Sequence, residues 1–387
     1  MADGTAEPTD AALRAVWSEV DLDAIRENVG ALRELARPAE FLAVVKANAY
    51  GHGAVPVARA ALEAGASWLG IARVEEGVQL RDAGITAPIM LLSEPAPRSA
   101  SVVVAHGLTP VVYTVAGIDA LAKAVADSGR AAPLEVHLKV DTGMHRVGST
   151  TDDAPALAEH VASRDELVLA GICTHLALAD EPADPYTDEQ LARFDALLQV
   201  LAARGLRPPL THAANSAGLL TSPPARYDLV RVGIACYGLP PAPALVGHAG
   251  VTLRPALSLR ARVTMVKELP AGARVSYGLR YELARPGRVA TVPAGYADGV
   301  PRNLGLVGGE VLIGGRRHPI AGMVTMDQLM VDLGDAPADV GDEVVLIGRQ
   351  GDQEVTATEW AQRLGTISYE IVTGIGARVP RTYRGAS

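Results

Sequence analysis

Lys46 is the residue in this chain best placed to do covalent or acid–base chemistry. It follows the apolar run 41–45, and the other lysines are Lys123, Lys139 and Lys267. An amine that loses water at the tip of a buried strand has a lowered pKa and can act as a nucleophile or a base. The alternative is a lysine whose stem is buried while its ammonium group stays in water.

Further polar residues stand at the ends of later apolar runs. They are Lys139 and the carboxylate Asp141, with Arg146 just beyond, then His175, His212 and Arg231. Each taken alone has an ordinary structural explanation, such as a hydrogen-bonded histidine or an ion-paired arginine. If parallel strands bring them to one barrel mouth, they create a positive field that suits a phosphate or a carboxylate.

His175, His212 and Asp141 also allow an alternative in which they bind a divalent metal ion. The surrounding lysines and arginines would repel a cation, which disfavours this alternative. We therefore expect no metal centre.

The segments after the last two predicted strands indicate a phosphate site. Residues 214–218 follow one strand and residues 231–234 end the other. In (β/α)8 barrels, the loops after the last two strands commonly bind phosphate. Ser216 offers a hydroxyl, and the N–H groups of Gly233 and Ile234 can face an anion. A phosphate and a strand-end lysine together indicate a Schiff base with pyridoxal 5′-phosphate.

The elements that must position these residues alternate between residues 21 and 247. Apolar runs predict strands at 41–45, 67–71, 88–92, 109–113, 134–140, 167–173, 208–211 and 228–232. Amphipathic stretches predict helices at 54–64, 73–83, 116–128, 152–163 and 187–203. This alternation predicts an α/β fold with an N-terminal (β/α)8, TIM-like barrel. An open doubly wound sheet is disfavoured because no Gly-x-Gly-x-x-Gly follows the first strand.

Beyond the proline-rich segment 240–243 the pattern changes. Short strands are predicted at 257–268, 274–277, 287–293, 310–313, 330–333 and 342–347, and a helix at 357–364 with Thr356 as its cap. The sequence thus predicts a mainly-β domain over 248–387. The run 13–20 predicts a strand that joins this domain, because a lone strand is unstable. Residues 1–12 are expected to form a disordered tail.

Composition narrows the class of protein. A chain of 387 residues with 49% hydrophobic content can build a barrel and a second domain. A net charge of −9 argues against nucleic acid or an anionic membrane as partner. Two cysteines form no disulfide framework, and neither a signal peptide nor a membrane-spanning run is recognisable. We expect a cytoplasmic protein.

The motifs around these residues resemble those of the alanine racemase family. In chain order they are 45–53, 139–146, 174–177, 212–216, 231–238, 275–278, 295–299, 326–327 and 366–370. The resemblance implies a barrel that binds pyridoxal 5′-phosphate, a C-terminal β-domain, and a homodimer that shares its active sites between subunits. The implied reaction interconverts L- and D-alanine and supplies D-alanine for cell-wall peptidoglycan.

The resemblance also implies residue roles. Lys46 carries the cofactor and acts as one catalytic base, and Tyr277 of the partner subunit acts as the other. The implied cofactor-binding residues are Lys46, Tyr50, His175, Asn215, Ser216, Arg231, Gly233, Ile234 and Tyr369. The implied substrate-binding residues are Arg146 and Met326. The implied supporting or entry residues are Lys139, which is carbamylated in many members, and His212, Tyr296 and Asp327.

These roles fit the chemistry of inversion at Cα. One base must stand on each face of the carbanion. Arg231, implied to lie at the cofactor's ring nitrogen, can only donate a hydrogen bond, so the ring nitrogen stays unprotonated. A cofactor ring with an unprotonated nitrogen withdraws electrons less strongly. This limits the lifetime of the carbanion and disfavours transamination. His175 is implied to link Tyr277 to Arg231.

Two positions depart from the family pattern. Thr325 stands where many members carry cysteine, and His145 where several carry a small residue. Thr325 could change the pocket wall, so the substrate is less firmly implied than the reaction. A racemase of wider scope, a related decarboxylase and a non-catalytic cofactor carrier are the alternatives. Arg231 disfavours the decarboxylase, and the motif at 275–278 disfavours the carrier.

Overall fold

The computed structural model describes residues 15–385, which form two compact units. The barrel unit comprises residues 24–49 and 54–254, and the β-unit comprises 15–23, 50–53 and 255–385. The predicted tail 1–12 and the first two residues of the predicted strand 13–20 lie outside the described residues.

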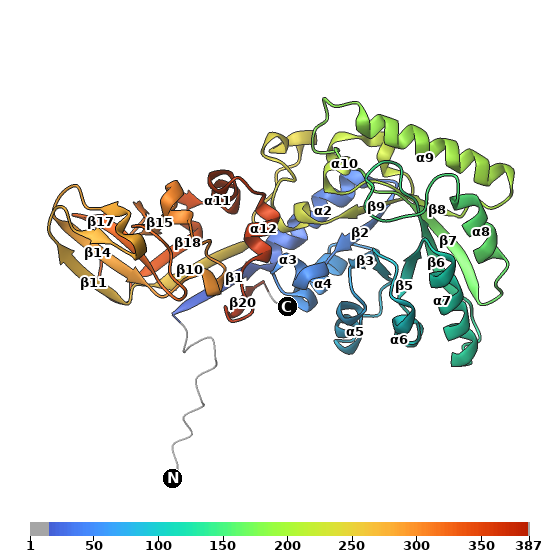
Figure 1. The fold of residues 1–387 in the computed structure, drawn as a ribbon, viewed down its shortest axis with the longest axis horizontal. Helices are drawn as coiled ribbons and strands as arrows, with labels where there is room; N and C mark the ends of the chain where they lie inside the picture. Colours follow the sequence, from blue (N-terminus) through green and yellow to red (C-terminus); the bar gives the residue numbers. More distant parts are fainter. Residues whose placement is uncertain (1–14, 386–387) are drawn as a thin grey trace, which may run out of the picture. The chain divides into compact units, whose positions relative to one another are not determined.

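Eight parallel strands form the barrel unit (Figure 1). They are β2 (Glu40–Val44), β3 (Trp68–Ile71), β4 (Ile89–Leu91), β5 (Thr109–Val112), β6 (Leu134–Lys139), β7 (Leu167–Cys173), β8 (Leu210–His212) and β9 (Leu229–Val232). Sequential neighbours pair from β2 to β8, and β2 also pairs with β9. Backbone hydrogen bonds from Asp228 to Thr211 and from Arg231 to Ala214 join β8 to β9. The predicted barrel is confirmed.

Helices surround the barrel strands (Figure 1). They are α2 (Leu22–Ala36), α4 (Ala54–Glu63), α5 (Val74–Asp82), α6 (Ala100–Ala105), α7 (Val115–Ser128), α8 (Ala154–Ala162), α9 (Tyr186–Ala203) and α10 (Ser216–Thr221). The short segment α3 (Lys46–Tyr50) has a left-handed backbone. Every residue of β3, β4 and β5 is buried, which explains why these strands, apart from Thr109 at the start of β5, read as apolar runs. The short helices α6 and α10 were not predicted.

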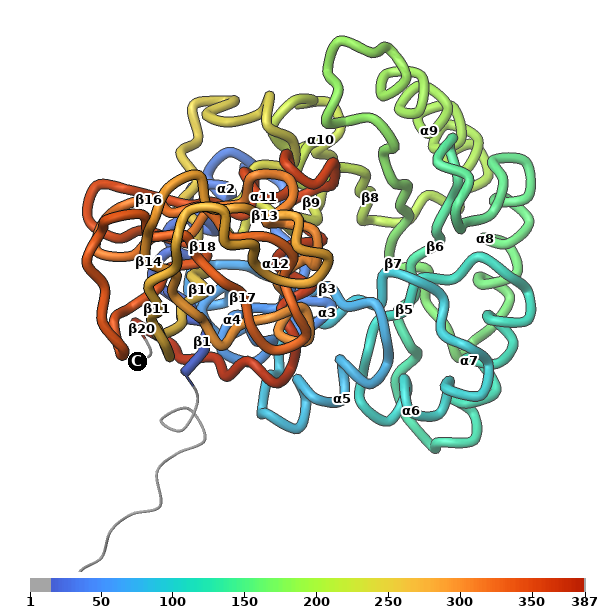
Figure 2. The backbone as a smooth tube through the Cα atoms, turned by 60° about the vertical axis from the view of Figure 1, so that its left-hand side comes forward, coloured from blue at the N-terminus to red at the C-terminus, as the bar shows by residue number. Residues whose placement is uncertain are grey.

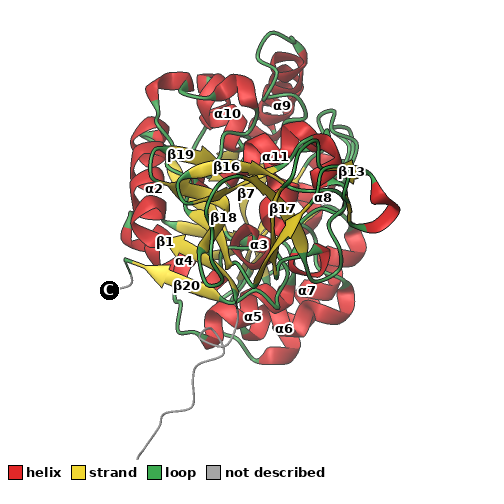
Figure 3. Cartoon of the chain, turned by 90° about the vertical axis from the view of Figure 1, so that its left-hand side faces the viewer, coloured by secondary structure: helices red, strands yellow, loops and turns green. Residues whose placement is uncertain are grey.

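Three sheets build the β-unit, whose strands are yellow in Figure 3. The largest has the order β16-β15-β18-β10-β1-β20, with β19 on β18; the others are β11-β14-β17 and β12-β13. Their bounds are β1 (Val16–Asp21), β10 (Leu257–Arg262), β11 (Met265–Leu269), β12 (Arg274–Val275), β13 (Tyr281–Glu282), β14 (Gly287–Val292), β15 (Glu310–Ile313), β16 (Arg316–Pro319), β17 (Leu329–Gly334), β18 (Glu343–Gln350), β19 (Gln353–Val355) and β20 (Arg381–Arg384). Two helices accompany them, α11 (Ala357–Leu364) and α12 (Ser368–Thr373).

Strand β1 lies between segments that are far away in the sequence. It pairs antiparallel with β10 and parallel with β20. Figure 2 lets the reader follow the chain from β1 through the barrel strands to the end at β20. Because β20 ends the described chain, β1 obtains one neighbour only after nearly all of the sequence has been placed.

The prediction of one strand over 257–268 is wrong. The chain leaves the large sheet after β10 and enters the three-stranded sheet as β11. The Val263 N–H still donates to Asp342, whereas the Thr264 N–H donates to Thr291. The hydrogen-bond partner therefore changes between two adjacent residues, which an apolar pattern does not reveal. The predicted helix 357–364 and its Thr356 cap are confirmed, since Thr356 Oγ1 accepts the Glu359 N–H at 3.0 Å.

Candidate active site

Lys46 opens a left-handed turn directly after β2. Ala47, Asn48, Ala49 and Tyr50 have φ values of 52°, 52°, 54° and 52°. L-residues in this region cost roughly 1–2 kcal/mol each, so an unsupported turn of this kind would unwind. Such strain concentrates at functional sites and persists only where surrounding contacts hold it.

Three hydrogen bonds support the turn within the barrel unit. Asn48 Oδ1 accepts the N–H of Ala54, the first residue of α4, at 2.8 Å. The Ala49 N–H donates to the carbonyl of Val45 at 2.8 Å. The Ala47 N–H donates to the carboxylate of Glu76 on α5. These contacts fix the direction in which the chain leaves β2, and with it the position of Lys46.

The environment of Lys46 favours its neutral amine. Burial is the main cause that lowers its pKa, the charge of Arg146 lowers it further, and Glu76 partly opposes both. Arg146 is exposed and has no ion-pair partner among residues 15–385. An arginine in that state can receive the carboxylate of a ligand.

Lys46, Lys139, Arg146 and Arg231 form a cationic cluster, because the charges of the other three all act on Lys139. Its Nζ donates to the carbonyl of Leu92 at 2.9 Å, and burial is the main cause that lowers its pKa. The charges of Arg231, Arg146 and Lys46 also lower the pKa of Lys139. A small cleft is lined by Lys139, Val140, Asp141, Met144, Arg146, Val147, Thr174 and His175. The cationic strand ends of the barrel unit therefore do converge.

Arg231 is buried at the end of β9 and is held by both terminal nitrogens. One donates to His212 Nδ1 at 2.9 Å. The other donates to the carbonyls of Thr174 and Ala213 at 2.8 and 3.0 Å, and to His175 Nδ1 at 3.3 Å. Its Nε–H donates to no residue in the described part of the chain. That donor remains for a ligand atom that can accept a hydrogen bond.

A chain of buried histidines extends from Arg231. His212 Nε2 lies 2.8 Å from Nδ1 of His137, a residue of β6 that the sequence reasoning did not single out. Burial, reinforced by Arg231, lowers the pKa of both imidazoles, and that of His137 falls to about 4. Arginine only donates, so His212 accepts at Nδ1 and carries its proton on Nε2. His137 then accepts at Nδ1 and carries its own proton on Nε2.

Acidification is expected to destabilise the protein through His137. The unfolded imidazole titrates near 6.5 and the folded one near 4, so the unfolded state binds more protons between these values. The contribution of His137 to the free energy of unfolding is fully present well above pH 6.5. It falls as the pH drops toward 4, and about 2 kcal/mol is lost at pH 5. Urea unfolding at pH 7.5 and pH 5 measures the fall. In His137→Leu the fall should be smaller by about that amount; equal falls would contradict the assignment.

Asp141 holds the loop that follows it through hydrogen bonds to the backbone. Its carboxylate accepts the N–H groups of Gly143 at 2.9 Å and His145 at 3.0 Å, and His145 lies in the left-handed region. These bonds help lower the pKa of Asp141. Within residues 15–385 no group of three histidine, cysteine, aspartate or glutamate side chains could hold a metal ion. The exposed imidazole of His145 also lies near this carboxylate, with its Nδ1 3.5 Å from Asp141 Oδ2.

The residues of the predicted phosphate site lie together after β8 and β9. Asn215 caps α10, and its Oδ1 accepts the Gly218 N–H at 2.9 Å. Ser216 Oγ accepts the Gly233 N–H at 2.9 Å, so that donor is used inside the protein here. The Ile234 N–H has no acceptor among residues 15–385. The segment thus offers a hydroxyl and a backbone donor side by side.

The remaining expected residues lie in the β-unit. The rings of Tyr50 and Tyr369 have their centroids 6.0 Å apart. Tyr277 is 69% exposed and Met326 is 54% exposed. Backbone bonds of 3.0 Å, from Tyr296 to Thr325 and from Ala297 to Met326, join the loops that carry Tyr296 and Met326. The Met326 N–H has no acceptor in the described chain.

Asp327 is held by an ion pair. Arg378 binds Asp327 and the buried Asp298, both at 2.7 Å. Asp298 also accepts the Gly295 N–H at 2.8 Å. This network ties the Met326–Asp327 loop to the turn that precedes Tyr296.

Both halves of the chain match known domain families. Residues 20–241 match the alanine racemase N-terminal domain, and residues 256–383 match the alanine racemase C-terminal domain. The chain belongs to the alanine racemase family. The resemblance found in the sequence is thereby confirmed, and the chain is an amino-acid racemase, an enzyme of the isomerase class.

Relatives that are named alanine racemase match this chain over nearly its full length. An alanine racemase of Symbiobacterium thermophilum is 53% identical, over 96% of this chain and 98% of the relative. The crystal structure of alanine racemase from D-cycloserine-producing Streptomyces lavendulae is 44% identical with a TM-score of 0.90, covering 97% of this chain and 98% of that one. A histidine racemase of Leuconostoc mesenteroides is 33% identical with a TM-score of 0.88, covering 97% and 99%. One fold thus carries racemases named for different substrates.

Two residues of this alanine racemase family member escaped the sequence reasoning. His137 lies inside β6, where its apolar neighbours conceal it, and Glu76 lies on α5 among other charged residues. The spacing of residues around them contains no signal for either. Each became visible only through a contact with a segment far away in the sequence.

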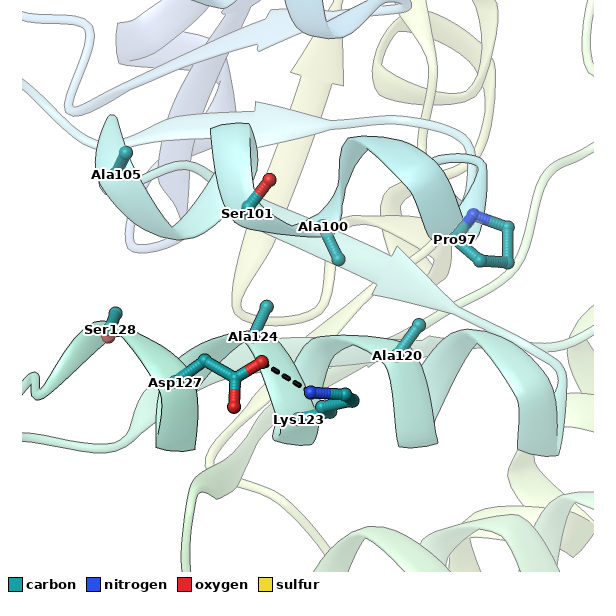
Figure 4. Close-up of a pocket in the computed structure, with 9 residues that line it drawn as sticks. All are labelled: Pro97, Ala100, Ser101, Ala105, Ala120, Lys123, Ala124, Asp127 and Ser128. Atoms are coloured by element: carbon teal, nitrogen blue, oxygen red, sulfur yellow. Dashed lines mark hydrogen bonds and ion pairs between the residues drawn. The ribbon is translucent and has the colours of Figure 1, made fainter.

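A separate hollow of about 350 Å³ lies between α6 and α7 (Figure 4). Small side chains line it, and Lys123 pairs with Asp127 at its edge. None of the residues of the cationic cluster takes part.

In the part of the barrel unit that the structure describes, no helix is long and apolar enough to cross a bilayer, and the same holds for the described β-unit.

Proposed function

We propose that this protein interconverts L- and D-alanine by two-base proton transfer at Cα. The observation that carries the proposal is the cationic cluster of the barrel unit, in which Lys46 has a lowered pKa beside Arg146. A lysine with a lowered pKa holds more neutral amine at neutral pH, so a larger fraction of it is available to accept a proton. Family membership and the names of the relatives support alanine as the substrate.

We propose pyridoxal 5′-phosphate as the cofactor, and the donor set of the chain fits it. Cationic side chains suit a phosphate, and the Arg231 Nε–H suits a ring nitrogen that accepts a hydrogen bond. The residues that would hold the group are Lys46, Tyr50, His175, Asn215, Ser216, Arg231, Gly233, Ile234 and Tyr369. When bound, pyridoxal phosphate withdraws electrons from Cα and so acidifies the Cα–H bond.

Residues of the chain supply the rest of the chemistry. Lys46 accepts or donates the proton on one face of Cα, and Tyr277 of the partner subunit does so on the other. Arg146 and the Met326 N–H bind the substrate carboxylate. His175 accepts from Arg231 at Nδ1, so its proton lies on Nε2 and can be donated to the oxygen of Tyr277. Tyr296 and Asp327 form part of the entry corridor.

A homodimer with shared sites is part of the proposal. The exposed Tyr277 and Met326 support it, because aromatic and methionine side chains are enriched in protein interfaces. Carbamylated as in many family members, Lys139 would carry a negative charge and steady Arg146, and His212 steadies Arg231 by accepting its hydrogen bond at Nδ1. In a cytoplasmic setting the enzyme would supply D-alanine for peptidoglycan.

A racemase of wider scope is the second candidate. The histidine racemase with the same fold favours it, as does Thr325, which stands where many family members carry cysteine. Thr325 Oγ1 donates to the Gln328 carbonyl at 2.8 Å and so shapes the loop that holds Met326. A chiral assay over a panel of amino acids separates the two candidates. Alanine should be the best substrate; a higher kcat/KM for another amino acid would favour the second.

The cofactor assignment has its own experiment. Borohydride reduction of the purified protein, followed by peptide mapping, should place the modification on Lys46. Modification of Lys123, Lys139 or Lys267 in its place would refute the role of Lys46. Absence of modification together with racemisation of alanine would refute the cofactor.

A further inference from the structure

Glu76 combines a capping-box contact at the start of α5 with a contact to a segment far away in the sequence. Its Oε1 accepts the Ala47 N–H at 2.7 Å. Its Oε2 accepts the N–H of Ala72 at 2.8 Å and that of Arg73 at 3.1 Å. One carboxylate therefore joins the residue after Lys46 to the chain that leaves β3.

The first contact acts on the strained part of the chain. Ala47 is the first of the consecutive left-handed residues, and its side chain is exposed, so packing does little to hold it. A hydrogen bond to a charged acceptor is stronger than one to a neutral acceptor. Glu76 thus supplies the anchor at the point where the turn begins.

The second contact anchors Glu76 itself. Ala72 and Arg73 follow β3, a fully buried strand next to β2 in the barrel. The carboxylate is therefore fixed to the rigid part of the barrel unit and transmits that rigidity to the turn. Side chains of a site are precise when their supports belong to such elements.

The charge of Glu76 also fits this position. It is the carboxylate that acts on Lys46, and it opposes the effects of burial and Arg146. All three of its partners are N–H donors, so both oxygens must accept. A glutamine would turn an NH2 group toward one of these donors and lose that bond.

We propose that Glu76 is a positioning residue, which holds the left-handed turn after β2 and thereby places the Lys46 amine for proton transfer. The inference rests on the proposed role of Lys46. It assigns no direct contact of Glu76 with a substrate. It predicts that an acceptor at both oxygens is required, so that the isosteric amide cannot replace the carboxylate.

Three variants of the full-length protein test this inference: Glu76→Gln, Glu76→Ala and the control Glu75→Gln. Glu75 is the exposed neighbour on the same helix. With pyridoxal phosphate and alanine, both Glu76 variants should lose about 100-fold in kcat with a smaller change in KM, because a slight misplacement of a catalytic group has effects of this size. The control should match the wild type. A Glu76→Gln enzyme with wild-type kcat would overturn the inference.

Two measurements on the cofactor-free protein keep this result separate from the proposed function. Hydrogen exchange in short peptides over 45–50 should be at least about tenfold faster in both Glu76 variants than in Glu75→Gln. The pKa of the Lys46 amine, followed by NMR after 13C reductive methylation, should fall in the Glu76 variants only. Unchanged exchange and pKa would refute the role of Glu76, even if alanine is racemised.

Failure of the proposed function gives a different pattern. Faster exchange and a lower Lys46 pKa in the Glu76 variants, without alanine racemisation in the wild type, would uphold the support of the turn and refute the reaction. Thermal melting checks that the variants fold. If Glu76→Ala does not fold, the result for Glu76→Gln alone tests the inference. The inference also requires that the Ala47 amide exchanges slowly in the wild type, because that amide donates to Glu76.

Discussion

Lys46→Ala is expected to lower alanine racemisation by at least about 10³-fold in both directions. The variant removes an amine whose pKa is lowered by burial and by Arg146, and a methyl group can neither transfer a proton nor form a Schiff base. Initial rates with L-alanine and with D-alanine measure the effect. Both directions must be affected, because each passes through the same two proton transfers in opposite order.

Lys123→Ala is the matched control for this loss. Lys123 lies on α7, is exposed, and pairs with Asp127 four residues on. It shares the chemistry of the amine without its burial or its cationic neighbours. The control should keep wild-type rates, and a Lys46→Ala enzyme that also kept them would remove Lys46 from the mechanism.

Tyr277→Phe is expected to lower racemisation by about 10²- to 10⁴-fold, the usual contribution of one acid–base group. The change removes one hydroxyl from a side chain that is already exposed, so the fold of the β-unit should be unaffected. With Lys46 intact, solvent deuterium should still enter the Cα position of one enantiomer while inversion is lost. Mass spectrometry of the recovered alanine distinguishes exchange from inversion.

Tyr281→Phe controls for the loss of a hydroxyl in the same region. The Tyr281 hydroxyl donates to Asp332 at 2.8 Å, and the ring packs against a small core of Val275, Leu283, Val289 and Ala321. Its removal should cost about 1 kcal/mol of unfolding free energy and leave kcat unchanged. Equal losses of kcat in the two variants would show that Tyr277 acts through the fold of this region.

Mixed dimers test whether the two bases come from different subunits. In a heterodimer of Lys46→Ala and Tyr277→Phe chains, a site shared across a two-fold axis combines either both intact residues or both altered ones. Random 1:1 mixing should therefore restore about a quarter of wild-type activity. Heterodimers that are demonstrated by mass and remain inactive would contradict shared sites.

Much of the fold could be predicted from the sequence because the barrel strands are buried on both faces. A fully buried strand such as β3 appears as a continuous apolar run, and the helices between such runs have a different period. The β-unit was harder. Its strands are short, and the break at Val263 and Thr264 depends on which distant strand receives each hydrogen bond.

The sequence by itself determined the family, the alternation of strands and helices, and the cationic residues at the strand ends. These are local properties, since motifs and apolar runs are contiguous. Only the tertiary structure decided the tautomers of His212 and His137, the exposure of Tyr277, and the contact of Glu76 with Ala47. Each depends on atoms that the chain brings together from far apart: 75 residues separate His137 from His212, and 29 separate Ala47 from Glu76. Burial and hydrogen-bond geometry exist only after folding, and they set the protonation and position of the groups that the sequence merely lists.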